Sequence, residues 1–379
     1  MKILIAGDLV PNHRLATLVA KDEVGNVLCN IKPFTDAADY SVVNLEAPIV
    51  SRSAEAIRKS GPALKTSRAV LQLIENAGFD GVTLANNHYR DYGQTGVEDT
   101  LATLDGAHID HVGGGRNGQE ARRPLVKDIG GERVAFVNVC EHEFSIATET
   151  HGGSNPMDVI EVHRQIRTAR EQADYVVLIT HGGHEHFQYP SPRMKQWYRF
   201  FIDAGADAVV NHHQHCFSGY EVYSGKPIIY GLGNFCFDKK GRNHTIWNEG
   251  YWVVLDLCKD KTSFEITPYS QCKDEVGVFP MTGKRKDDFW RRMDELNSVI
   301  ADDGRLHDIY KAYCEEKKRE ILTVFGPTAN RYVNALVHRH LLPVLLSKGK
   351  AAEIYDYLNC EAHRDLSQWA LADYIKTYS

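Results

Sequence analysis

Short apolar runs alternate with amphipathic segments along most of this chain, and this alternation constrains its fold more than any other feature. The runs are rich in Val, Ile and Leu, are too short for helices and end in polar residues. They span residues 2–8, 41–46, 81–88, 175–181, 207–213 and 228–234. Apolar residues recur at helical spacing over 67–78, 95–107, 157–173 and 191–205. Strands that alternate with helices predict an α/β core.

The pattern changes towards the carboxyl end of the chain. Residues 218–231 and 250–269 each read as a β-hairpin, so the sheet content is predicted to be mixed. From residue 283 onwards the segments are helical by period and composition. We therefore predict a main domain over 1–275 and a helical C-terminal extension over 283–379. The apolar faces of that extension predict packing, either closing over the main domain or forming a homodimer interface.

Charge and composition exclude several classes of partner. The net charge of −6 over 379 residues offers no general attraction to nucleic acid or to an anionic membrane. No apolar run reaches the length of about 18 residues that a transmembrane helix needs. The 8 cysteines include no Cys-x-x-Cys pair, which is typical of reduced thiols. These features predict a cytoplasmic protein without a transmembrane segment.

Residue types that bind metals stand where the predicted strands end. These positions carry Asp8, Asn44, Glu46, Asn86, Asn87, His88, His181, His212, His213, His215 and Asn234. Each one alone is as typical of a turn or of a satisfied core position. Because ligands bind at the carboxyl ends of strands in α/β sheets, the whole set can converge on one site. Mixed oxygen and imidazole ligands suit Mn, Fe or Zn, so the sequence predicts a site for one or two divalent metal ions.

Six stretches of the chain match a known pattern in order and spacing. They are "AGDLV" at 6–10, "VVNLEAPI" at 42–49, the block at 77–126 that contains "ANNHYRDYG", "GGHE" at 182–185, "DAGADAVVNHHQHC" at 203–216 and "GKPIIYGLGNFCFD" at 225–238. Together they resemble the CapA (poly-γ-glutamate capsule biosynthesis) family of the calcineurin-like metallophosphoesterase superfamily. The resemblance implies a four-layer α/β/β/α sandwich, to which the helical extension is appended, and a metal-dependent hydrolase.

The resemblance also implies roles for individual residues. The metal ligands would be Asp8, Glu46, Asn87, His181, His213 and His215, with His212 as an alternative to His213. Val10 stands where the superfamily usually has a histidine, so the ion held by Asp8, Glu46 and His215 would have one nitrogen ligand fewer. We therefore expect one well-held ion and a second, weaker one.

His88 would protonate the leaving group, and Asp91 either orients His88 or serves as a turn or N-cap residue. Glu185, Glu221 and Asn234 are candidate substrate contacts.

A cation site in a net-negative protein predicts an anionic substrate, either a small molecule or a polymer. A phosphoester fits this chemistry, and so does a γ-glutamyl amide of capsule or poly-γ-glutamate metabolism, attacked by a metal-activated water. The alternative is a non-catalytic, metal-stabilised subunit of a capsular polymer synthesis or export complex. The presence of His88 beside the predicted ligands favours the hydrolase, because a scaffold needs no proton donor there.

Overall fold

Two β-sheets packed face to face form the centre of the molecule. The computed structural model describes residues 1–51, 53–259, 261–325, 332–333, 336, 339, 341–343 and 346–378. The first sheet has the order β16-β15-β14-β1-β2-β3-β4, and β13 pairs with β1 beside this path. Its strands are β1 (Lys2–Val10), β2 (Tyr40–Leu45), β3 (Gly81–Thr83), β4 (Asp110–Val112), β13 (Asn234–Phe237), β14 (Glu249–Asp256), β15 (Ser263–Gln271) and β16 (Val278–Pro280).

The second sheet has the order β11-β12-β10-β9-β7-β6. Its strands are β6 (Leu125–Ile129), β7 (Glu132–Cys140), β9 (Tyr175–His181), β10 (Ala208–His212), β11 (Tyr220–Tyr223) and β12 (Lys226–Ile229). A third, two-stranded sheet pairs β5 (Gly114–Gly115) with β8 (Gly153–Ser154). Both parallel and antiparallel pairs occur, as the two predicted hairpins required.

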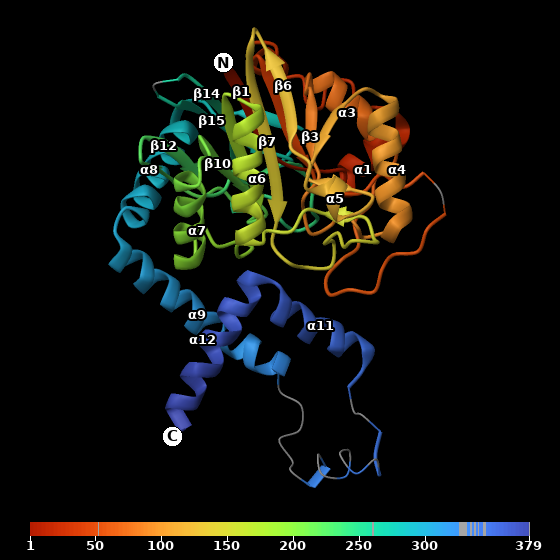
Figure 1. The fold of residues 1–379 in the computed structure, drawn as a ribbon, viewed down its shortest axis with the longest axis vertical. Helices are drawn as coiled ribbons and strands as arrows, with labels where there is room; N and C mark the ends of the chain where they lie inside the picture. The colour runs from red at the N-terminus through yellow and green to blue at the C-terminus, as the bar shows by residue number, and fades with distance from the viewer. Residues whose placement is uncertain are drawn as a thin grey trace.

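Helices cover the outer face of each sheet and complete four layers (Figure 1). The helices on the first sheet are α1 (His13–Lys21), α3 (Val70–Ala77) and α4 (Gly93–Gly106), and those on the second are α6 (Val159–Gln172) and α7 (Pro192–Asp203). Shorter helical segments are α2 (Lys32–Thr35), α5 (Gly118–Ala121) and the 3₁₀ turn η1 (Ile246–Asn248). The predicted α/β/β/α sandwich is confirmed.

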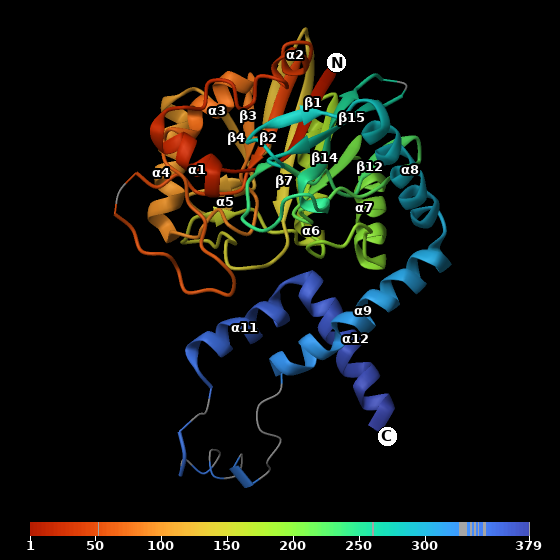
Figure 2. The same ribbon diagram turned by 180° about the vertical axis from the view of Figure 1, so that it is seen from behind.

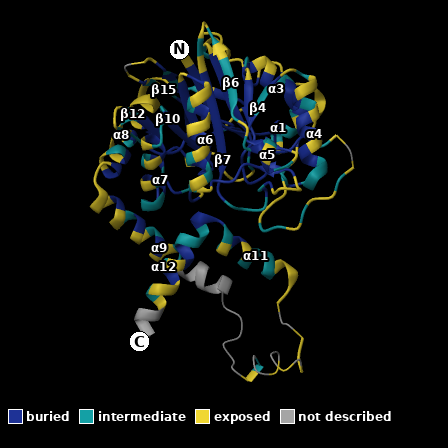
Figure 3. Ribbon diagram, in the orientation of Figure 1, coloured by how far each residue is buried: buried dark blue, intermediate teal, exposed yellow. Residues whose placement is uncertain are grey.

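The period-two alternation of the strands decides which side chains lie between the sheets. In β1, Ile3 and Ile5 pack in the core between the two sheets, whereas Leu4 and Ala6 pack in the core under the outer helices. Both faces of the central strands are therefore buried, which explains their continuous apolar runs. Figure 3 shows this burial along the strands, with exposed residues on the outer sides of the helices.

One segment predicted as a single strand forms parts of two strands in different sheets. The run over residues 228–234 is not a single strand, because β12 ends at Ile229 in the second sheet and β13 begins at Asn234 in the first. Gly233, at φ +76°, lies in the link between them, and side chains other than glycine rarely adopt this conformation. The crossing carries Asn234 to the end of β1. The predicted strand over 81–88 is also shorter, since β3 ends at Thr83.

Most of the described chain beyond residue 283 is helical, as predicted. Its helices are α8 (Gly283–Ile300), α9 (Asp303–Phe325), α11 (Lys348–Asn359) and α12 (Glu361–Tyr378). Figures 1 and 2 show α8 along the side of the sandwich and the other three beyond the end opposite the N-terminus. Among the described helices, none has the length and apolar character needed to cross a bilayer.

The extension, residues 283–378, is tied to loops at the carboxyl ends of the second sheet's strands. Arg193 on α7 pairs with Asp365 on α12 at 2.6 Å. His142, just after β7, contacts Glu361 at 2.6 Å, and the Tyr310 hydroxyl lies 3.1 Å from Nε2 of His184. The extension therefore closes over the main domain, which is one of the two arrangements that the sequence left open; the homodimer interface stays a prediction.

Candidate metal centre

An irregularity in β1 turns Asp8 into the space between the sheets. Ala6 pairs with Val43 of β2, but the next partners are Asp8 and Asn44, so Gly7 is an extra residue in β1. Such a bulge reverses the alternation and re-aims the following side chain. A Cβ atom on Gly7 would lie 2.0 Å from the carbonyl oxygen of Gly233, so the bulge requires glycine.

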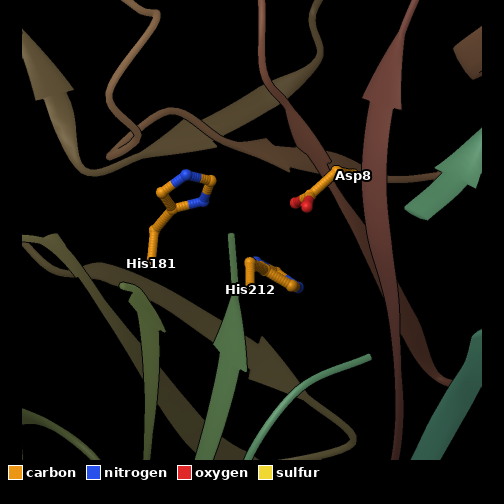
Figure 4. Close-up of side chains that lie close together, drawn as sticks. All are labelled: Asp8, His181 and His212. Carbon is orange, nitrogen blue, oxygen red and sulfur yellow. The ribbon is translucent and has the colours of Figure 1, made fainter. Parts of the chain in front are cut away.

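The same alternation brings ligand residues in from three other strands. Val42 packs between the sheets, which places Asn44 and Glu46 on that side of β2. In β9 and β10 every second side chain is apolar and lies on the face between the sheets. His181 and His212 take the next inward-facing positions at the ends of these strands, where they are paired with each other. Figure 4 shows Asp8, His181 and His212 facing one another from β1, β9 and β10.

Three overlapping groups of buried side chains have the geometry to hold a metal ion. In each group one potential ligand atom per residue lies within 4.8 Å of the others; the groups are Asp8–His181–His212, Glu46–His181–His213 and Asp8–Glu46–His215. Two of these groups match the ligand sets expected from the sequence, apart from Asn87. His212 and His213 both belong to the cluster, so they are not mutually exclusive. Asp8 and Glu46 each occur in two groups and link them.

The chemistry of Glu46 fits a bound cation. Both carboxylate oxygens are buried and have no hydrogen-bond partner among the described residues. Oε1 of Glu46 lies 3.5 Å from Nε2 of His181 and 3.9 Å from Nε2 of His215. Burial, reinforced by the negative charge of Asp8, raises the pKa of Glu46 well above its usual value. A positive ion would compensate both the missing hydrogen bonds and the carboxylate repulsion.

The pKa values of the cluster histidines are shifted in different directions. Burial, reinforced by the neighbouring His213, holds the pKa of His181 well below its usual value, and burial lowers that of His213 to about 4. Burial acts the same way on His215, but Glu46 and Asp8 outweigh it and raise the pKa to about 9. Neutral imidazole is the form that binds metals.

Backbone strain accompanies the last two of these histidines. His213 has φ 89° and His215 has φ 55°. Non-glycine residues rarely adopt such values, and when they do they cluster at ligand sites and active sites. The strain therefore aims two successive imidazoles inward from one short loop.

The side-chain oxygens of Asn87 and Asn234 lie close to nitrogens of cluster histidines. Oδ1 of Asn87 lies 3.1 Å from Nε2 of His181, and Oδ1 of Asn234 lies 2.9 Å from Nδ1 of His215. Asn44, which the sequence also marked, donates to Asp8 at 2.7 Å. Asn234 contacts His215 here, and its expected contact with substrate stays a prediction.

His88 lies beside the cluster, with Asp91 as its partner. Nδ1 of His88 is 2.6 Å from Oδ2 of Asp91, and both side chains are buried. Lys59 forms an ion pair with the other oxygen of Asp91, and its Nζ is 3.1 Å from Nδ1 of His88. The sequence analysis did not identify Lys59, because it lies in a stretch without periodic pattern.

The remaining candidates fall in different places. Glu185 lines a cleft between the loop after β9 and the extension. Glu221 is not brought to the cluster: its carboxylate accepts hydrogen bonds from Arg199 at 2.6 Å and from Tyr230 at 2.5 Å on the edge strand β11. Glu143, which the sequence analysis missed, lies 3.9 Å from Nε2 of His213 and accepts from Asn87 at 3.3 Å.

Comparison with known proteins agrees with this geometry. Residues 2–239 match the family described as bacterial capsule synthesis protein PGA_cap. The chain belongs to the PGA_cap family. This family is part of the metallophosphoesterase-like superfamily. The match includes every cluster residue, His88, Asp91 and Lys59, whereas the extension lies beyond it.

Relatives in the PGA_cap family carry names from capsule synthesis. The chain is 31% identical to the capsule biosynthesis protein CapA of Bacillus anthracis over 247 residues, covering 63% of this chain and 60% of that protein. It is 30% identical to the PGA biosynthesis protein CapA of Bacillus subtilis over 267 residues, covering 69% of each. Among solved structures, a hypothetical protein from Thermus thermophilus matches with a TM-score of 0.46 and 17% identity, over 74% of this chain and 100% of that one.

Proposed function

We propose that this PGA_cap protein is a metal-dependent hydrolase that acts on an anionic substrate, a phosphoester or a γ-glutamyl amide, in capsule or poly-γ-glutamate metabolism. The observation that carries the proposal is the convergence of Asp8, Glu46 and four histidines, with an unsatisfied carboxylate among them. The names of the relatives support the metabolic setting.

One or two divalent ions, Mn, Fe or Zn, would be held by the residues of the three groups. One set is Asp8, Glu46 and His215, and the other is Glu46, Asn87, His181 and His213; His212 adds a nitrogen near Asp8 and His181. Beside His215, the imidazole of His212 would be a second nitrogen ligand for the ion at Asp8, in place of the histidine missing at position 10. A bound divalent ion supplies a water nucleophile at neutral pH and polarises the substrate oxygen.

His88 would donate the proton to the leaving oxygen or nitrogen. Its contact with Asp91 fixes the ring, and the short distance of 2.6 Å indicates a strong, charge-assisted hydrogen bond. With Nδ1 committed to Asp91, Nε2 is the nitrogen that can face a substrate. Asp91 is thus proposed to orient His88.

Substrate would approach through the cleft between the main domain and the extension. This cleft has a volume of about 400 Å³ and is lined by Glu185 and His186 on one side and by Tyr313 and Lys317 of α9 on the other. The ring of His186, which lines this cleft, lies 6.3 Å from the ring of His215 in the cluster. Glu185 is proposed to contact the substrate there.

The test is reconstitution of the metal-free chain with Mn²⁺, Fe²⁺ or Zn²⁺. It is followed by assays on p-nitrophenyl phosphate, bis(p-nitrophenyl) phosphate and γ-glutamyl p-nitroanilide. We expect His88→Ala to lower turnover with metal content intact and His181→Ala to lose metal as well. His163→Ala, in a half-buried histidine on α6, is the control and should change neither. Metal binding without turnover on any substrate would instead support the non-catalytic subunit of a capsular polymer complex.

A further inference from the structure

We propose that Lys59 is a positioning residue that fixes the carboxylate of Asp91 and, through it, the imidazole of His88. The inference rests on the proposed function, because it assigns the group that prepares His88 for proton transfer. Lys59 lies in the loop between Val50 and Thr66, where the sequence shows neither helical nor strand periodicity.

The loop between Val50 and Thr66 wraps around Asp91. Its backbone N–H at Ile57 donates to the carbonyl oxygen of Asp91 at 2.8 Å. Its backbone N–H at Leu64 donates to Oδ2 of Asp91 at 2.7 Å. Lys59 lies between these two contacts in the sequence, so the loop holds Asp91 by three groups.

The ammonium group of Lys59 is buried beside two other titratable groups. Its side chain is only 4% exposed, and lysine is almost never buried so far unless it is paired. Nζ forms an ion pair with Oδ1 of Asp91 and lies 3.1 Å from Nδ1 of His88. An ammonium group so placed acts on the imidazole directly and through the carboxylate.

Hydrogen-bond chemistry then assigns the proton on His88. The ammonium group and the backbone N–H of Leu64 can only donate, so Asp91 accepts from both as an ionised carboxylate. Its Oδ2 can accept a further hydrogen bond, and Nδ1 of His88 at 2.6 Å is placed to donate it. The ammonium group, 3.1 Å from the same nitrogen, could bond only to an unprotonated Nδ1, and we assign the shorter contact to Asp91 as the hydrogen bond. A hydrogen on Nδ1 bonded to Asp91 leaves Nε2 on the substrate side, and donation to a leaving group uses a second hydrogen there, so the donating form of His88 is the imidazolium. Lys59 therefore fixes both the orientation of the ring and its tautomer.

If Lys59 only anchored the loop, it would not act on His88. Substrates whose leaving groups differ in basicity distinguish this structural role from the positioning role. Proton donation matters more for a basic leaving group, so loss of a properly held His88 slows phenyl phosphate hydrolysis more than p-nitrophenyl phosphate hydrolysis. We expect Lys59→Met to lower kcat with Mn²⁺ at least 10-fold more for phenyl phosphate than for p-nitrophenyl phosphate. Lys59→Arg should restore part of the loss, since the guanidinium also pairs with carboxylates.

Two controls make the comparison specific. Lys65→Met changes an exposed lysine of the same loop, whose Nζ lies 4.9 Å from the ring centre of Tyr92, and should leave both rates unchanged. The double variant Lys59→Met/His88→Ala should be no slower than His88→Ala alone, because both changes remove one function. Equal losses on both substrates, or additive losses in the double variant, would overturn the proposal.

A second readout does not depend on turnover. In the metal-free full chain, ¹⁵N NMR of the histidine rings should show His88 with hydrogen on Nδ1, and Lys59→Met should shift this tautomer while Lys65→Met does not. An unchanged tautomer in Lys59→Met would refute the positioning role. If the wild-type chain hydrolyses neither the phosphate esters nor γ-glutamyl p-nitroanilide but the tautomer shifts, the proposed function fails and the role of Lys59 in holding the ring stands.

Discussion

Replacing Glu46 by glutamine should have opposite consequences in the metal-free and metal-loaded protein. The substitution keeps the shape of the side chain and removes its ability to carry a negative charge. In the metal-free protein this carboxyl is buried, lacks hydrogen-bond partners in the described structure and lies near Asp8. Glu46→Gln should therefore leave the free energy of unfolding of the metal-free chain unchanged or raise it by about 1 kcal/mol.

The metal-dependent part of the stability should almost disappear. Glu46 belongs to two of the three ligand groups, so its loss affects both proposed ions. At a Mn²⁺ concentration of about 100 times Kd, binding stabilises the wild type by about 2.7 kcal/mol. A roughly 100-fold weaker Kd leaves about 0.4 kcal/mol at the same concentration. The difference of about 2.3 kcal/mol corresponds to roughly 5 °C in Tm for a domain of ~250 residues.

The assay is thermal unfolding of chelator-treated protein with and without Mn²⁺. Glu221→Gln is the matched control, because this glutamate is also largely buried and is paired with Arg199, but it lies on edge strand β11. It should lower Tm in both conditions and keep the full Mn²⁺-dependent increase. A Glu46→Gln protein that is clearly destabilised without metal, or that keeps the wild-type increase with Mn²⁺, would refute the reasoning.

Two further predictions concern the fold that positions the site. Gly7→Ala should destabilise the protein by about 3 kcal/mol or more in urea unfolding, because its Cβ would meet Gly233 at 2.0 Å. Gly25→Ala, where a Cβ meets nothing within 4 Å, should change the stability by less than about 0.5 kcal/mol, and equal effects would contradict the bulge argument. Arg193→Gln leaves two carboxylates without their partner, at a cost of about 3 kcal/mol. Limited proteolysis should then release the extension before the main domain is cut, and uniform resistance would contradict this role.

The positions of several site residues could be predicted because they continue the strand pattern. In β9 and β10 the inner face is marked by apolar residues two apart, and His181 and His212 take the next places. The same alternation could also have shown that His212 points between the sheets. His212 is then a further candidate ligand and not only an alternative to His213. Asp8 follows a different rule: the alternation alone would send it outward, and only the bulge at Gly7 reverses it.

The other site contacts depend on loop paths and long-range docking, which carry no periodic signal. Lys59 meets Asp91 across 32 residues of chain, from the middle of a loop without regular structure. Arg193 meets Asp365 across 172 residues, through the docking of α12 against α7. Local propensity and hydrophobic period determine neither contact, because both arise from the tertiary arrangement of separate elements.

The most direct test of the metal centre is an anomalous-scattering measurement on crystals of the full chain loaded with Mn²⁺. The account predicts one or two anomalous peaks between the two sheets, within bonding distance of Asp8, Glu46, His181, His213 and His215. Saturated crystals whose peaks lie elsewhere, or that show no peak among these side chains, would contradict it.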